Sequence, residues 1–424
     1  MPDETTTRAK PASRRWSSLS RLRELPALPR LLLLTQLAFN IGFYLVVPFL
    51  ATHLAEDLAM AGWAIGIVLG VRTFSQQGMF ALGGALSDRF GIRPTVLTGC
   101  ALRVLGFVVL AAAGDFATVL AGTVLIGFAA ALFSPAVESA LAERGTDLEE
   151  RGIITRTELF GLFAVCGEVG AVTGPLLGAA LLGVDFALTC SVAAGVFVLI
   201  LLAHARMLPR GTREPRPFLA GWARIARNRT FLVFAAAYSA YLLSYNQLYL
   251  ALPVELGRAG AGWALGWMFA LASVLVVLGQ LPLASWARSG LGAGRALPLG
   301  FGLLSLSFAA VAAWAPWPPL PGGFALAPAV CFVVLLSFGQ MLAVPVAQDL
   351  VPRLADGEDL GSHFGFLSSA GGLAVLLGSG GVGGLLDLAG RPGPLAVVPW
   401  LVLAALPALG GVVLLVLARR SARP

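Results

Sequence analysis

Long apolar runs alternate with short polar connections along almost the whole chain. Twelve apolar segments can be delimited, six before and six after a polar, arginine-rich stretch at 208–230. They run over 31–53, 62–86, 95–114, 116–141, 154–183, 186–207, 231–256, 262–286, 296–315, 324–350, 362–388 and 395–418. A helix needs roughly 20 apolar residues to cross a bilayer, and no segment shows the alternating pattern of a membrane strand. The pattern predicts an all-α integral membrane protein with twelve transmembrane helices in two six-helix halves.

The same pattern divides the chain into five parts. An N-terminal tail, 1–30, precedes a six-helix bundle, 31–207, and a central loop, 208–230, leads to a second bundle, 231–418, and a short tail, 419–424. A faint repeat supports two related halves. The stretch from Trp286 to Arg295 follows the eighth segment as Ser87 to Gly91 follow the second, with Ala287 in place of the acid.

Composition and charge agree with a membrane location. The chain is 58% hydrophobic and 12% charged, with a mean hydropathy of +0.85, whereas soluble proteins are about 25% charged. Arg258 and Arg391 fall on one side of the layout and Arg72 and Arg103 within segments, so the other 25 of the 29 lysines and arginines share the opposite side. The positive-inside rule places that side, both termini and the central loop in the cytoplasm of a multi-pass cell-membrane protein. The charge therefore sets topology and does not indicate a nucleic-acid partner.

The sequence carries no pattern typical of an enzyme. The three histidines are scattered, without metal-binding spacing, and no G-x-x-x-x-G-K-[ST] loop for ATP is found. We therefore expect no catalytic residue, no metal and no cofactor. The four cysteines lie in or at the ends of apolar segments, where cysteine acts as a small hydrophobic residue, so no disulfide is expected.

The connection between the second and third segments, 84–94, reads GALSDRFGIRP. We expect Gly84 to let two helices approach closely and Gly91 to supply the backbone freedom of a tight reversal. The pattern G-x-L-x-D-R-x-G-x-R resembles the signature loop of major facilitator superfamily transporters. The resemblance implies that the acid docks near the start of the eleventh helix and latches one conformation. The latch residues would be Gly84, Asp88, Arg89, Gly91 and Arg93, although Ile92 stands where the family usually has a basic residue.

The fifth segment contains Gly170, Gly174 and Gly178 at intervals of four residues. This spacing gives one smooth helix face against which another helix can pack closely, and Pro175 removes a backbone hydrogen bond and bends the helix. The pattern G-x-x-x-G-P-x-x-G resembles the motif that marks the proton-coupled antiporters of this superfamily. The alternative interpretation is an ordinary tightly packed helix.

Glu168 lies about midway along the same segment, where an ionised side chain costs at least ~2.5–3.5 kcal/mol. A carboxyl group whose surroundings change between conformations can bind and release a proton there. The alternative is a structural ion pair with Arg103 of the third segment or Arg72 of the second. Glu158 and Glu138 lie nearer the segment ends, as further stations for protons or as partly solvated anchors.

In the fold of this family the first, fourth, seventh and tenth helices line a central cavity. The seventh segment holds four of the five tyrosines at spacings of three and four residues, which places them on one helix face. Such a stripe is either core packing or a cavity lining. An aromatic, amide-rich cavity with few charges suits hydrophobic or amphipathic ligands. The expected lining residues are Asn40, Tyr44, Phe133, Tyr238, Tyr241, Tyr245, Asn246 and Gln340.

Within the superfamily, the chain is similar to bacterial multidrug-efflux drug:proton antiporters, a branch supported by the run RTFSQQG at 72–78 together with DRFG at 88–91. The resemblance implies proton-coupled efflux of small molecules by alternating access, with a proton gradient as the energy source. The expected partners are a small-molecule substrate, protons and the lipid bilayer, and we expect a monomer. Two alternatives stay open: a proton-coupled uptake symporter for a small metabolite, and a transport-inactive membrane scaffold or receptor.

Overall fold

The computed structural model describes residues 25–154, 156–182, 185–209, 220–286, 291, 293–319, 321–355, 360–390 and 392–421, and these residues form helices and no strand. The helices of the first half are α2 (Ala27–Val46), η2 (Val47–Phe49), α3 (Leu50–Glu56), α4 (Gly62–Thr73), η3 (Phe74–Gly78), α5 (Phe80–Phe90), α6 (Ile92–Ala111), α7 (Phe116–Glu150), α8 (Arg156–Leu182) and α9 (Phe186–Met207). After α10 (Ala220–Arg227), the second half contains α11 (Arg229–Arg258), η4 (Gly262–Ala264), α12 (Leu265–Trp286), α13 (Ala293–Trp314), η6 (Gly322–Leu326), α14 (Ala327–Leu354), α15 (Leu360–Leu386), η7 (Asp387–Gly390), η8 (Pro394–Ala396) and α16 (Val397–Ser421).

Among the described residues, ten helical segments are long and apolar enough to cross a membrane. Two further membrane segments complete the predicted twelve. One is α4–η3–α5, which is divided into short pieces, and the other is α11, in which tyrosine, serine, asparagine and glutamine lower the hydropathy. The architecture is thus the predicted all-α membrane fold. The central loop differs from the prediction because it contains the short helix α10, and α11 already begins at Arg229.

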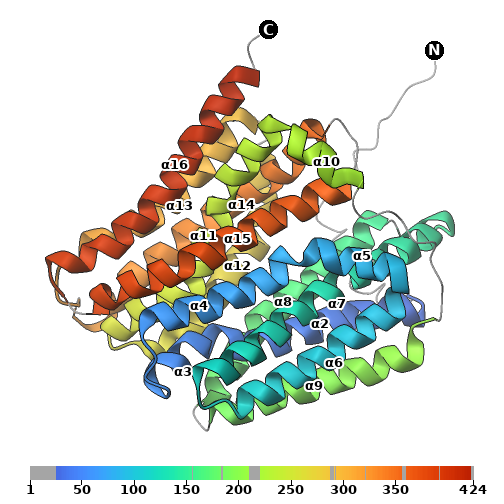
Figure 1. Ribbon diagram of the computed structural model, residues 1–424, viewed down its shortest axis with the longest axis horizontal. Coiled ribbons are helices and arrows are strands. Elements are labelled where there is room, and N and C mark those ends of the chain that lie inside the picture. Colours follow the sequence, from blue (N-terminus) through green and yellow to red (C-terminus); the bar gives the residue numbers. More distant parts are fainter. Residues whose placement is uncertain are drawn as a thin grey trace, which may run out of the picture.

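The helices of each half pack mainly on one another. In the first half α2 packs on α8 and α9, and α6 packs on α7 and α9. In the second half α13 packs on α14 and α16, and α11 packs on α15 and α16. The halves meet where α4 and η3 lie along α15 and where α8 lies along α12, and α4 and α15 run side by side in Figure 1.

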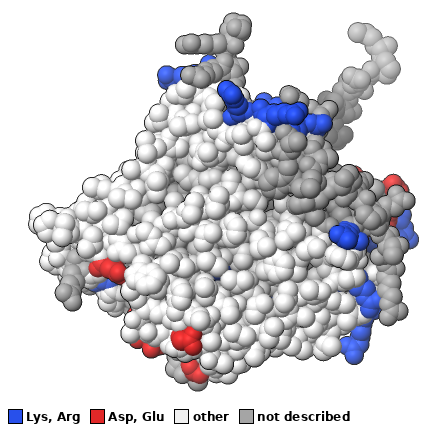
Figure 2. All heavy atoms as spheres, viewed as in Figure 1, with Lys and Arg blue, Asp and Glu red and all other residues white. Residues whose placement is uncertain are grey.

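Arginines gather at one end of the molecule (Figure 2), at the ends of α5, α9, α10 and α16 and the start of α13. We call this the arginine-rich end. Acidic residues predominate at the opposite end, which we call the acidic end. Among the described residues, Arg258 is the one arginine at that end. The exposed acids of that end are Glu56, Asp57, Asp115, Asp185 and Asp387.

The second membrane segment is not the continuous helix that the pattern predicts for 62–86. The π-helical turn η3 separates α4 from α5 although no proline lies there. Such turns occur frequently at functional sites. α5 then continues through residues 87–90, which the sequence placed in a connection, and ends where Gly91 has a φ of +88°. This positive φ confirms the predicted role of Gly91.

The prediction that Gly84 lets helices approach closely is wrong for this conformation. A Cβ atom at Gly84 would meet no atom of the described residues within 4 Å, whereas one at Gly83 would collide with the carbonyl oxygen of Ala131 in α7. Successive helix residues point about 100° apart. The close approach therefore belongs to Gly83, and Gly84 lies on a different face.

The glycine face of the fifth membrane helix is confirmed. A Cβ at Gly170 would lie 2.6 Å from Cβ of Asn40, and one at Gly174 would lie 2.6 Å from Cβ of Tyr44. A Cβ at Gly178 would collide with the carbonyl oxygen of Leu45. Only glycine therefore allows α8 to lie this close to α2 along three successive helical turns.

Glycines also bring the two halves into backbone contact. A Cβ at Gly66 of α4 would collide with the carbonyl oxygen of Ser379 in α15, and one at Gly372 of α15 would lie 2.7 Å from the backbone nitrogen of Gly78 in η3. At the acidic end the backbone N–H of Gly62 donates a hydrogen bond to Oδ1 of Asp387, 3.2 Å away. An acid at the first turn of a helix is electrostatically favourable, so Asp387 of the second half stabilises the start of α4 in the first.

The close packing of α4 on α15 predicts a selective effect of one methyl group. Gly66→Ala should weaken the contact between the halves by about 1–3 kcal/mol, the usual range for overpacking. Hydrogen–deuterium exchange should then become faster in the first turns of α4 and the last turns of α15. The control is Gly381→Ala, because a Cβ at Gly381 meets no described atom within 4 Å. Unchanged exchange in the Gly66 variant would contradict this description of the interface.

Candidate functional site

A chain of buried polar side chains connects the two halves inside the membrane region. Nη2 of Arg72 donates to Oγ1 of Thr73 over 2.9 Å, and this hydroxyl donates to Oδ1 of Asn246 over 3.0 Å. Nδ2 of Asn246 in turn donates to Oγ of Ser379 over 3.4 Å. All four side chains are buried, with exposures of 4% or less. The chain therefore runs from α4 of the first half to α11 and α15 of the second.

The guanidinium group of Arg72 is held between aromatic rings. Its Cζ lies 5.3 Å from the ring centroid of Tyr249 and 5.5 Å from that of Phe43, within the range of cation–π contacts. Its Nε and Nη1 atoms have no hydrogen-bond partner among the described residues. A buried cation without an acidic partner is costly, so this arginine is a strong candidate for a functional group.

Arg103 occupies a similar aromatic site within the first half. Its side chain is fully buried, and its Cζ lies 4.5 Å from the ring centroid of Phe39 and 5.0 Å from that of Phe197. Nη1 donates to the carbonyl oxygen of Ile126 over 2.9 Å. Arg103 thus joins α6 to α2, α7 and α9. Glu168 forms no ion pair with Arg72 or Arg103 among the described residues. The alternative interpretation of Glu168 as a partner of one of these arginines is therefore not observed in this conformation.

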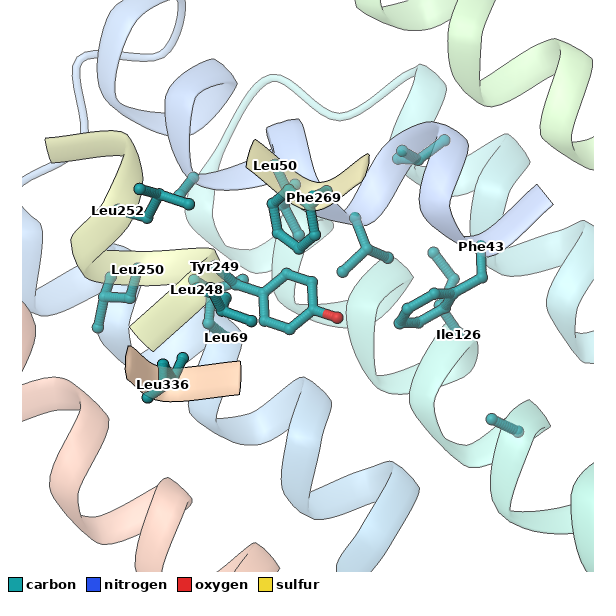
Figure 3. Packing of buried hydrophobic residues seen from close by; sticks show 14 of the residues in the cluster. Phe43, Leu50, Leu69, Ile126, Leu248, Tyr249, Leu250, Leu252, Phe269 and Leu336 are labelled. Carbon is teal, nitrogen blue, oxygen red and sulfur yellow. The ribbon is translucent and has the colours of Figure 1, made fainter. Parts of the chain in front are cut away.

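The four tyrosines of α11 form one continuous row, as their spacing predicts. Ring centroids of Tyr238 and Tyr241 lie 5.4 Å apart, those of Tyr241 and Tyr245 6.2 Å, and those of Tyr245 and Tyr249 6.4 Å. The first three rings are partly exposed, whereas Tyr249 is buried against Phe269 of α12. Figure 3 shows Tyr249 beside Phe269, with its hydroxyl directed toward the side of Phe43.

Tyrosines of the two halves come close together beside Arg72. Tyr44 of α2 lies close enough to Tyr245 and Tyr249 of α11 for electrostatic interaction between their hydroxyl groups. Tyr249 and Tyr44 both lie close enough to Arg72 for electrostatic interaction. Hydroxyl groups from both halves are thus gathered beside one buried cation.

Glu168 lies beside the same tyrosines. Its half-buried side chain is on α8, close enough to Tyr44 and Tyr245 to interact electrostatically with both. α8 is positioned here by the glycine face described above, since a Cβ at Gly170 would already touch Asn40. The structure thus brings Glu168, the tyrosine hydroxyls and Arg72 together, with the tyrosines connecting the acid to the cation.

Other predicted cavity residues lie in different surroundings. Phe133 does not line a cavity: its exposure is 2%, and its ring stacks on Phe39 at 4.6 Å in the core of the first half. Asn246 is equally buried and belongs to the hydrogen-bond chain between the halves. Asn40 is partly exposed and donates to the backbone of Gln36 one turn earlier, and Gln340 is partly exposed on α14.

The predicted latch residues and the predicted proton-path residues Glu158 and Glu138 are not observed at this site among the described side chains. Asp88 and Glu158 belong to α5 and α8, but their side chains lie outside the described residues. Glu138 is exposed on α7, and Arg89 is exposed with its Cζ 5.4 Å from the ring centroid of Phe90. Nη2 of Arg93 donates to the carbonyl oxygen of Ala205 over 2.6 Å, a contact within the first half.

Three residues of the interface were not found from the sequence. Thr73 and Ser379 complete the hydrogen-bond chain, and Oγ of Ser369 in α15 donates to the carbonyl oxygen of Gly78 in η3 over 2.8 Å. Short hydroxyl side chains are common in membrane helices and pack like small residues. The one available signal was the position of Thr73 directly beside an arginine inside an apolar segment.

Comparison with known proteins identifies the family of this architecture. The family model of the Major Facilitator Superfamily matches residues 32–358. An uncharacterized MFS-type transporter of Mycobacterium tuberculosis is 39% identical over 376 residues, which cover 85% of this chain and 86% of the relative. The multidrug resistance protein MdtH of Cronobacter sakazakii is 33% identical over 390 residues, covering 91% and 92% of the two chains.

Solved structures share the fold at low sequence identity. A crystal structure of an auto-inhibited POT family peptide transporter has a TM-score of 0.77 at 18% identity, covering 94% of this chain and 99% of that chain. The nucleoside transporter NupG has a TM-score of 0.76 at 13% identity, covering 92% and 99%.

The hydrogen bond between Thr73 and Asn246 predicts an energetic coupling between the halves. Thr73→Val and Asn246→Leu should each destabilise the protein, and together by less than their sum, with a coupling energy of about 0.5–1.5 kcal/mol. Reversible unfolding in mixed detergent micelles measures all four free energies. Ser239→Ala serves as the control partner, because this α11 hydroxyl donates to Ala235 of its own helix. Additive effects for Thr73 and Asn246 would contradict the proposed coupling.

Proposed function

The chain belongs to the major facilitator superfamily, a family of membrane transporters and not of enzymes, and we propose that it exports hydrophobic or amphipathic small molecules in exchange for protons. The observation that carries this proposal is the position of Glu168 within a membrane helix, beside Tyr44 of one half and Tyr245 of the other. An ionisable residue inside a membrane marks a pathway for ions, protons or substrates.

Glu168 is the proposed proton carrier. Its carboxyl group lies near Tyr44 of its own half and Tyr245 of the other, so movement of one half against the other changes its surroundings. Such a change alters proton affinity, and proton binding from one side with release to the other couples transport to the proton gradient. Arg72 holds a fixed positive charge beyond the tyrosines and favours the ionised carboxylate when the two groups approach each other.

The tyrosine row is the proposed contact surface for substrate. The rings of Tyr238, Tyr241 and Tyr245 are partly exposed and follow one another along α11. Aromatic surfaces with a few hydroxyl groups bind apolar molecules mainly through non-directional packing, so the ligand needs few precisely placed polar groups. The name multidrug resistance protein, given to relatives 31–33% identical to this chain, supports the same substrate class.

Alternating access follows from the two interfaces between the halves. The α4–α15 and α8–α12 contacts are lined by glycine and other small residues, which allows the halves to rock as rigid bodies around a midplane site. By the positive-inside rule, the arginine-rich end faces the cytoplasm. The energy source is the proton gradient, in which one charge gains ~2.3 kcal/mol across 100 mV. A single chain without a cofactor suffices for this cycle.

Everted membrane vesicles provide the test. Respiration acidifies the vesicle lumen and quenches an acridine dye, and an exported substrate added outside should enter in exchange for protons, so that fluorescence recovers. The probes are an amphipathic cation, a neutral aromatic compound and an amphipathic anion. Gly174→Ala should abolish recovery, because the added Cβ forces α8 away from Tyr44.

The matched control for this assay is Gly195→Ala, since a Cβ at Gly195 meets no described atom within 4 Å. It should respond like the unmodified protein. Absence of recovery with all three probes, in vesicles shown to contain folded transporter, would contradict antiport. Recovery that persists in the Gly174 variant would show that the packing of α8 on α2 is not required for coupling.

A further inference from the structure

An apolar cavity of about 280 Å³ lies in the second half at the arginine-rich end. It is formed where α11 and α13 begin and where α14 and α16 end. Phe234, Leu297 and Leu414 form its deep, buried wall. Its mouth contains the exposed residues Thr230 and Gly294 and the partly exposed Ala418. The cavity thus opens near the membrane surface and extends into the hydrocarbon region.

Arginines lie next in sequence to three residues that line this cavity. Thr230, Gly294 and Ala418 each directly adjoin an exposed arginine in the sequence. These three arginines belong to three different helices, and none forms an ion pair with an acid among the described residues. The cluster lies at the end of the molecule where α16 finishes and where Figure 2 shows Lys and Arg atoms gathered. Its members are Arg229 of α11, Arg295 of α13 and Arg419 of α16.

We propose that this cavity binds one anionic phospholipid of the leaflet at the arginine-rich end, with an acyl chain in the cavity and the phosphate group between the three arginines. Basic pockets between transmembrane helices on the cytoplasmic side bind anionic lipid headgroups, and arginine matches the geometry of phosphate oxygens. A phosphate ion from water would leave the apolar interior unfilled. A neutral lipid would leave the three charges without a partner.

The proposed lipid site is connected to the tyrosine row of α11 through the side chain of Phe234. Phe234 forms part of the cavity wall, and its ring stacks on Tyr238 with centroids 5.8 Å apart and an interplanar angle of 13°. An acyl chain in the cavity therefore fixes Phe234 from one side while Tyr238 contacts it from the other. The site is separate from Glu168 and Arg72, so it persists whether or not those residues couple transport to protons.

Native mass spectrometry of the purified, delipidated full-length protein tests this site. The protein is offered equal amounts of phosphatidylglycerol and phosphatidylcholine with the same acyl chains. We expect phosphatidylglycerol to be retained at least about tenfold better. The triple variant R229Q/R295Q/R419Q should lose this preference. The control R30Q/R151Q/R206Q removes the same charge from exposed arginines of the first half and should keep it.

A second variant tests the apolar part of the site. A Cβ at Gly294 would meet only Cβ of Ala418, at 3.7 Å, so Gly294→Leu is accommodated and narrows the mouth. It should reduce phosphatidylglycerol retention several-fold while all three arginines remain, and thermal unfolding confirms that each variant is folded. Equal retention of the two lipids by the unmodified protein, equal losses in both triple variants, or displacement of the lipid by glycerol phosphate would each overturn the proposal.

Discussion

A polar group inside a membrane has no water to bind, and this constraint organises the protein. A buried donor or acceptor is therefore costly unless it finds a partner within the chain. Here the partners repeatedly come from the other half. Thr73 of α4 donates to Asn246 of α11, which donates to Ser379 of α15, and the hydroxyl of Tyr44 of α2 lies near those of Tyr245 and Tyr249. The two halves are thus joined by side-chain hydrogen bonds inside the membrane region.

Glycine supplies the complementary property, a surface without side chains. The backbones of α4 and α15 come into contact at Gly66 and Gly372, and α8 lies on α2 through Gly170, Gly174 and Gly178. Close backbone approach strengthens packing where no hydrophobic effect operates between helices. Because few side chains interdigitate at such a contact, one helix can also move along the other. Because Glu168 lies on the same helix as Gly170, Gly174 and Gly178, its surroundings depend on how that helix sits against α2.

Regular local spacing explains what the sequence predicted well. The tyrosine row and the glycine face follow from intervals of three and four residues, which a helix converts into a stripe. The partners across the interface follow no such rule, since Thr73 and Asn246 are 173 residues apart and Asn246 and Ser379 are 133 apart. Phe133 was assigned to the cavity because the fourth helix lines it in this family, but sequence alone does not tell which face of that helix meets the cavity and which the core. Gly84 and Gly83 differ by one helical step, which a consensus pattern alone does not resolve.

The central claim is that Glu168 carries the proton and does not merely hold the structure. The most direct measurement compares two modes of transport in proteoliposomes containing Glu168→Gln, with Glu150→Gln as the control because that acid is exposed at the end of α7. Glutamine keeps the size and hydrogen-bonding capacity of the side chain but cannot ionise. We predict that exchange of labelled for unlabelled substrate at equal pH continues at close to the normal rate while accumulation driven by a proton gradient is lost. Accumulation at the normal level, or loss of both modes together, would contradict this account.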